Sequence, residues 1–224
     1  MNIQELELHT RQLGAIKNFY TQVLELPGHH ESDNQICFAA GNSKLYFKHD
    51  PERSPGVYHF AFRVPFLLFD DIVEKLRGRV EFLPDPASGN EIIKHVEWQA
   101  QAVYFLDPEG NIVEIIAHKT IPAIQDVSIN APAHIVSICE IGLAVPDVPA
   151  FATELKNKLE LSQWKTGNEK FEAVGDAEGL FILAEENRPW FPTKLGAADL
   201  PVRVMVSTPG KANIEAGQYT IEQH

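Results

Sequence analysis

The chain opens on a stretch in which polar and apolar residues alternate. Leu6 and Leu8 are interleaved with Glu5, Glu7 and His9. A hydrophobic period of two predicts a strand with one polar and one apolar face. The three polar side chains are therefore expected to share one face of a sheet.

Helical periodicity follows each stretch of this kind. Apolar residues recur at positions three and four apart over residues 13–24, 66–76 and 148–159, which predicts three amphipathic helices. The helices are followed by short runs that favour strands, at residues 35–39, 44–48, 80–83, 92–98, 103–106, 112–117, 170–174, 180–184 and 218–222. The sequence Asp-Pro-Glu-Gly at 107–110 is typical of a turn between two strands.

These elements recur as a repeat. Residues 5–27 align without a gap with residues 140–162 at an offset of 135, so that Glu5 falls over Glu140. A weaker copy begins at His59, and VRVMVS at 202–207 begins a fourth that lacks a convincing helix. The unit is a strand, a helix and about three further strands. The sequence therefore predicts an α+β fold of tandem βαβββ modules, with a third module and a truncated fourth.

The boundary between two domains is expected at residues 121–133, which contain Pro122 and Pro132 and show little periodicity. This linker would separate a domain of two modules, residues 1–120, from a degenerate and truncated repeat, residues 134–224. The formal charge of −12 argues against nucleic acid and anionic membrane surfaces as partners. Two cysteines, no apolar run of membrane-spanning length and an acidic N-terminus predict a cytoplasmic protein.

Two residues in apolar strands are candidates for chemistry. Glu114 lies within IVEII, where a buried carboxylate requires a partner. That partner could be Arg63, a lysine or a metal ion. His59 lies within VYHFAF, where an isolated histidine is more often a satisfied, partly buried residue than a ligand. The tryptophans, among them Trp98 and Trp190, are expected in the core or at an interface.

Several of these features together resemble the vicinal oxygen chelate superfamily, which includes glyoxalase I, the bleomycin- and fosfomycin-resistance proteins and the extradiol dioxygenases. The resemblance is carried by YFLDPEGNIVEIIAH at 104–118, by His59 at the start of a strand and by FYTQVLELP at the end of the first helix. It implies that the first two modules curl into an open, eight-stranded cup. In the superfamily such a cup holds a divalent metal that chelates two neighbouring substrate oxygens.

The resemblance also implies a ligand set. Its positions correspond to Glu5, His59 and Glu114, and the donors suit Mn²⁺, Fe²⁺, Co²⁺, Ni²⁺ or Zn²⁺. Glu5 is also the candidate general base, and Glu7, His9 and Arg63 are predicted to bind substrate. The second half offers Glu140 at the first-ligand position but no histidine or glutamate to complete a set there, so it is expected to serve packing, dimer contact or closure over the first cup.

The function expected from the sequence is a divalent-metal-dependent enzyme that performs isomerase- or lyase-like chemistry on a small oxygenated metabolite. The alternative is a metal-free protein that binds a small molecule, as bleomycin-resistance proteins do. The partner in both cases is a small molecule, and a homodimer is compatible with either.

Overall fold

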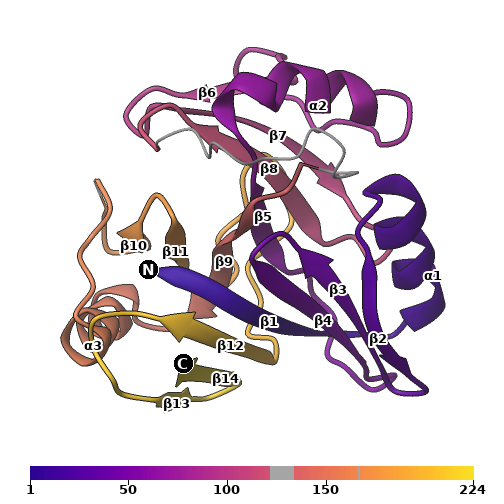
Figure 1. Cartoon of the computed structure of the whole chain (residues 1–224). Coiled ribbons are helices and arrows are strands. Elements are labelled where there is room, and N and C mark those ends of the chain that lie inside the picture. The colour runs from indigo at the N-terminus through magenta and orange to yellow at the C-terminus, as the bar shows by residue number, and fades with distance from the viewer. Residues whose placement is uncertain (122–133, 166) are drawn as a thin grey trace.

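Two seven-stranded sheets form the framework of the protein in the residues that the computed structural model describes, 1–121, 134–165 and 167–224 (Figure 1). The predicted linker at 121–133 lies outside these residues except for Ile121. The first sheet has the strand order β13-β14-β12-β1-β4-β3-β2, and the second has the order β10-β11-β9-β5-β8-β7-β6.

The chain builds these sheets module by module. The first module contains β1 (Asn2–Thr10), α1 (Leu13–Asn18), a π-helical turn η1 (Phe19–Val23), β2 (Gly28–Ser32), β3 (Gln35–Ala40) and β4 (Ser43–His49). The second contains β5 (His59–Arg63), a 3₁₀ turn η2 (Phe66–Leu68), α2 (Phe69–Leu76), β6 (Ile93–His95), β7 (Ala100–Leu106) and β8 (Ile112–His118). The third contains β9 (Ser137–Val145), α3 (Val148–Leu159), β10 (Phe171–Asp176) and β11 (Gly179–Glu185). The last contains β12 (Val202–Ser207), β13 (Ile214–Ala216) and β14 (Tyr219–Gln223).

The α+β class and the repeated modules are confirmed, and the three predicted helices form close to the expected positions. The predicted strand at 80–83 is reduced to isolated bridges of Val80 and Phe82. The turn at 107–110 forms as expected, because Gly110 has a φ of 85° and its N–H donates to the carbonyl of Asp107 at 2.9 Å.

The pairing of the modules differs from the expected cup of residues 1–118. Strand β5 of the second module pairs antiparallel with β9 of the third, and β1 of the first pairs antiparallel with β12 of the last. The first and second modules therefore belong to different sheets. Each sheet crosses the boundary that the sequence predicts between the two halves of the chain.

The main core lies between the two sheets and under the helices. Alternation along β5 sends Phe60 and Phe62 into this core, and Leu6 and Leu8 of β1 enter it from the other sheet. The opposite face of β5 carries His59, Ala61 and Arg63. In the second sheet this opposite face is lined by a separate cluster of alanines, larger aliphatic side chains and aromatic rings. It forms the concave side on which the candidate site lies.

Candidate functional site

Strand register brings two glutamates to the same place on the concave face of the second sheet. Ala61 of β5 is the register partner of Glu114 on β8 and of Glu140 on β9. The two carboxylates thus flank a residue whose side chain is a single methyl group. His59 lies two positions before Ala61 on the same face of β5.

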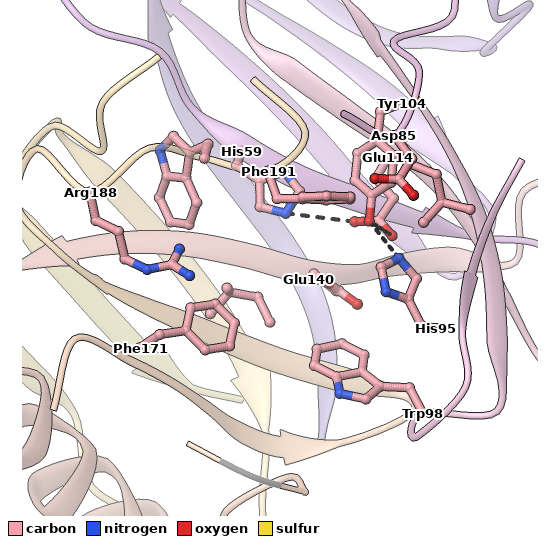
Figure 2. A pocket seen from close by; sticks show the side chains of 13 residues that line it. His59, Asp85, His95, Trp98, Tyr104, Glu114, Glu140, Phe171, Arg188 and Phe191 are labelled. Atoms are coloured by element: carbon pink, nitrogen blue, oxygen red, sulfur yellow. Dashed lines mark hydrogen bonds and ion pairs between the residues drawn. The ribbon is translucent and has the colours of Figure 1, made fainter. Parts of the chain in front are cut away.

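These three side chains form a compact buried cluster (Figure 2). One ligand atom from each of His59, Glu114 and Glu140 lies within 4.8 Å of the other two, and the residues are 6%, 2% and 2% exposed. The Nε2 atom of His59 is 3.6 Å from Oε2 of Glu114, which is too long for a hydrogen bond. The Oε1 atom of Glu140 has no hydrogen-bond partner among the described residues. The three side chains thus bring their potential ligand atoms close together without satisfying them by hydrogen bonds to one another.

Burial controls the protonation of this cluster. Burial raises the pKa of Glu114 to about 8, although the hydrogen bond from Tyr104 acts to lower this pKa. Burial, together with the nearby charge of Glu114, raises the pKa of Glu140 well above its ordinary value. Burial also lowers the pKa of His59 to about 4. At neutral pH the imidazole is neutral, so no cationic side chain of the cluster offsets its two acids.

Hydrogen bonds from outside the cluster fix the orientation of two of its members. The hydroxyl of Tyr104 donates to Oε1 of Glu114 at 2.8 Å, and Nε2 of His95 lies 2.9 Å from the same hydroxyl. Nδ1 of His59 lies 3.4 Å from the carbonyl oxygen of Ile112. Donation from Nδ1 to this carbonyl leaves Nε2 of His59 as a lone-pair donor facing the acids, which is the usual arrangement of a metal-binding histidine.

The cluster forms one wall of a cavity of about 480 Å³. The other walls are largely aromatic and include Trp98, Phe171, Trp190 and Phe191. Trp190 reaches this position because residue 142 is glycine: a Cβ there would lie 2.7 Å from the indole ring. The volume is within the range of small-molecule sites, and the combination of apolar walls with a few convergent polar groups is typical of them.

The first sheet carries a second version of the same arrangement in which cationic side chains have been added. Met205 of β12 is the register partner of Glu5 on β1 and of Glu222 on β14, as Ala61 is of Glu140 and Glu114. Arg203 takes the place that corresponds to His59, and its Nη2 donates to Oε2 of Glu222 at 2.5 Å.

Glu5 is neutralised in the same way. The ammonium group of Lys44 donates to Oε1 of Glu5 at 3.0 Å. In the second sheet, the residue that corresponds to Lys44 is Leu180, the register partner of Glu140. The two acids of the first sheet are therefore paired with protein cations, whereas those of the second sheet have no such partner in the part of the chain that the structure describes.

This arrangement corrects the predicted site. Glu5 does not meet His59 and Glu114, because β1 and β5 belong to different sheets, and Glu140 takes the place that Glu5 was expected to fill. Glu5 and Glu140 occupy the same position in their modules, and it is the copy in the third module that lies with His59 and Glu114. Because Glu5 lies in the other sheet, its predicted role as general base at this site also loses its structural basis.

The residues predicted to bind substrate lie elsewhere. Oε2 of Glu7 accepts from the amide of Gln35 at 2.8 Å, and Nδ1 of His9 lies 2.8 Å from Asp50. Arg63 is buried at the end of β5, and its Nη1 atom lies 3.5 Å from Oε1 of Glu178. None of the three lines the cavity described above.

Several residues of the cavity were missed from the sequence. Trp98 and Trp190 were expected in the core or at an interface, and Phe171, Arg188 and Phe191 gave no signal. Glu140 did carry a signal, since the repeat aligns it with Glu5. What the sequence did not reveal is which strand pairs with the first strand of each module.

Comparison with solved structures identifies the fold. The crystal structure of a putative dioxygenase from Bacillus subtilis subsp. subtilis str. 168 matches 100% of this chain over 85% of its own length, at a TM-score of 0.66 and 15% sequence identity. The chain has the vicinal oxygen chelate fold. Other matching structures include a lactoylglutathione lyase from Agrobacterium tumefaciens, with 20% identity, a TM-score of 0.43 and coverage of 51% of this chain and 92% of its own. A glyoxalase/bleomycin resistance protein/dioxygenase from Nocardioides matches with 22% identity, a TM-score of 0.42 and coverage of 55% of this chain and 87% of its own.

Sequence comparison gives no further identification. No family model matches the chain, and no curated protein sequence matches it significantly. Within the described residues, none of the helices is long and apolar enough to cross a membrane.

Proposed function

We propose that the cup of the second sheet binds a divalent metal ion through His59, Glu114 and Glu140, and that the protein is a metal-dependent enzyme acting on a small oxygenated molecule. The observation that carries this proposal is the buried convergence of one imidazole and two carboxylates, with no cationic side chain paired to the acids among the described residues. Ionised carboxylates in such a place cost several kcal/mol each unless a positive charge compensates them.

The first sheet supports this interpretation as an internal comparison. There the equivalent acids, Glu5 and Glu222, are neutralised by Lys44 and Arg203. The sheet that lacks both cationic side chains has a histidine at the place of Arg203, and histidine is a metal ligand. The difference between the sheets is what is expected if one has kept a metal site and the other has replaced the ion with side chains.

The donor set fits several metals. One imidazole nitrogen and two carboxylate oxygens suit Mn²⁺, Fe²⁺, Co²⁺, Ni²⁺ or Zn²⁺, and three protein ligands leave coordination positions open for substrate. When bound, such an ion polarises carbonyl or hydroxyl oxygens of a substrate as a Lewis acid.

The chain's own residues would provide the remaining functions. Glu140 has a carboxylate oxygen without a hydrogen bond, so it is the candidate general base for a proton on a substrate carbon beside a carbonyl. Tyr104 holds Glu114 in place, and His95 in turn contacts Tyr104. Trp190 and Phe191 line the cavity with apolar surface against which a substrate could pack. Isomerase- or lyase-like chemistry is consistent with these roles.

The test is a metal titration of the chelator-treated protein by isothermal titration calorimetry. We expect one equivalent of divalent metal, with affinity at least about 100-fold lower in His59→Ala and Glu140→Gln, because each removes a direct ligand. Arg203→Gln is the matched control, since it alters the corresponding residue of the other sheet, and it should leave the affinity unchanged.

Two results would contradict the proposal. The wild-type protein could bind no divalent metal at any pH between 6 and 9, or the two ligand variants could bind it as tightly as the wild type. The first of these results would favour the metal-free binding protein, which the aromatic cavity would also suit.

A further inference from the structure

The side of the cavity away from the carboxylates contains a cationic group that has no acidic partner among the residues that the structure describes. Arg188 lines the cavity, and Figure 2 shows its guanidinium directed inward on the side opposite Glu114 and Asp85. Its only hydrogen bond from the side chain among the described residues is from Nη1 to the carbonyl of Pro189, at 3.4 Å. Burial lowers the pKa of Arg188, and no carboxylate acts against that effect. Most of the five N–H donors of the guanidinium therefore remain available to a ligand.

The position of Arg188 is fixed by its surroundings. The guanidinium carbon lies 4.6 Å from the centre of the Phe171 ring, a cation–π contact that orients the flat group. The main chain is held as well. The backbone carbonyl of Arg188 accepts from the N–H of Ala197 at 2.8 Å, and the backbone N–H of Arg188 donates to the backbone carbonyl of Glu185 at 3.0 Å. A guanidinium held in this way is prearranged for a planar anion such as a carboxylate, which it binds with two parallel hydrogen bonds.

The rest of the cavity favours a planar ring. Its walls include Trp98, Tyr104, Phe171, Trp190 and Phe191. The rings of Tyr104 and Phe191 contact each other edge to face, with 5.6 Å between their centres. Aromatic walls stabilise an aromatic ligand beyond the burial of its surface. The acids that could repel an anion are accounted for: Asp85 accepts hydrogen bonds from Ala87 and Ser88 of its own loop, and Glu114 and Glu140 lie on the opposite side.

We infer that the cup takes an aromatic carboxylate, with Arg188 binding the carboxylate group and the aromatic walls holding the ring. This inference names the substrate class of the enzyme proposed above. It rests on that proposal because it places the substrate in the same cup. The carboxylate on Arg188 would direct the other end of the ring toward His59, Glu114 and Glu140.

The experiment is a calorimetric titration of chelator-treated protein with benzoate, benzamide and cyclohexanecarboxylate. Benzamide keeps the ring and removes the charge, and cyclohexanecarboxylate keeps the charge and removes the aromatic ring. We expect benzoate to bind at least about tenfold more tightly than benzamide and several-fold more tightly than cyclohexanecarboxylate.

Variants assign the effect to Arg188. Arg188→Gln should weaken benzoate at least tenfold and leave benzamide within twofold, and Arg188→Lys should give an intermediate loss because it keeps the charge without the planar fork. Arg79→Gln is the matched control, since Arg79 pairs with Glu25 on the surface and does not line the cavity. Equal binding of benzoate and benzamide, no binding of any probe, or an Arg188→Gln variant that behaves like Arg79→Gln would each overturn the inference.

A metal titration of Arg188→Gln separates the two proposals. The variant should bind metal as the wild type does, because Arg188 is no ligand. If the wild type binds no metal but benzoate still depends on Arg188, the proposed metal enzyme fails while the aromatic carboxylate site stands. If metal binds and benzoate is indifferent to Arg188, the reverse holds.

Discussion

Glu114→Gln should stabilise the metal-free protein at high pH. In the folded state the pKa of Glu114 is raised by burial from its ordinary 4.5 to about 8. Between these pH values the folded protein holds a proton that the unfolded chain has released, so the free energy of unfolding falls as the pH rises through this window. Glutamine is nearly isosteric with the protonated acid, can still accept from Tyr104, and does not ionise.

The magnitude follows from that difference. At about 1.4 kcal/mol for each tenfold change in the dissociation constant, the full effect at pH 9 is about 5 kcal/mol. The cavity admits water, which relieves part of the cost of desolvation, so we expect about 2–3 kcal/mol. For a chain of this length that corresponds to about 4–12 °C in Tm at pH 9, and to a much smaller difference at pH 5.

The assay is thermal unfolding of the chelated wild-type and Glu114→Gln proteins, followed by circular dichroism at pH 5, 7 and 9. A parallel metal titration should show that the variant loses at least about 100-fold in metal affinity. A variant more stable without metal but defective in binding it would mark Glu114 as a residue kept for function. The reasoning would be refuted if Glu114→Gln were less stable than the wild type at pH 9, or if its advantage did not grow with pH.

Three further predictions concern charged residues outside the cluster. Glu5→Gln should change stability by less than about 0.5 kcal/mol and leave metal affinity as it is, because the Lys44–Glu5 pair is partly exposed; a loss of metal binding would restore the original assignment of Glu5. Glu109→Gln should cost about 3 kcal/mol in denaturant unfolding, since the buried Arg53 loses its partner. Burial acts to raise the pKa of Glu109, but hydrogen bonds from Thr10, Arg53 and Arg11 outweigh it and lower the pKa to about 2. The wild type's advantage should therefore be complete above pH 4.5 and disappear as the pH falls toward 2, and an advantage that persisted there would contradict this. Replacing the cations of the first sheet, in the double variant Arg203→His and Lys44→Leu, should add a second, weaker equivalent of metal in calorimetry; a stoichiometry unchanged at one would argue against the equivalence of the two sheets.

The sequence by itself determined the modules. Alternation over Glu5 to His9, helical spacing in the three helices and the turn at 107–110 are local patterns, and the structure contains all of them. The importance of His59 and Glu114 as partly or fully buried polar residues was also readable, because each lies in an apolar strand. These features depend on neighbours in the chain, which a sequence displays directly.

Only the tertiary structure decided which modules share a sheet. The first strands of the modules are alike, so the sequence does not say whether β5 pairs with β1 or β9, and the choice depends on long-range packing. That choice exchanges Glu5 for Glu140 in the candidate site and leaves Glu5 beside Lys44. It also brings Arg188 and Trp190, which follow β11, over the cup. The residue types of the site are thus a property of the repeat, while their assembly is a property of strand pairing between segments far apart in the chain.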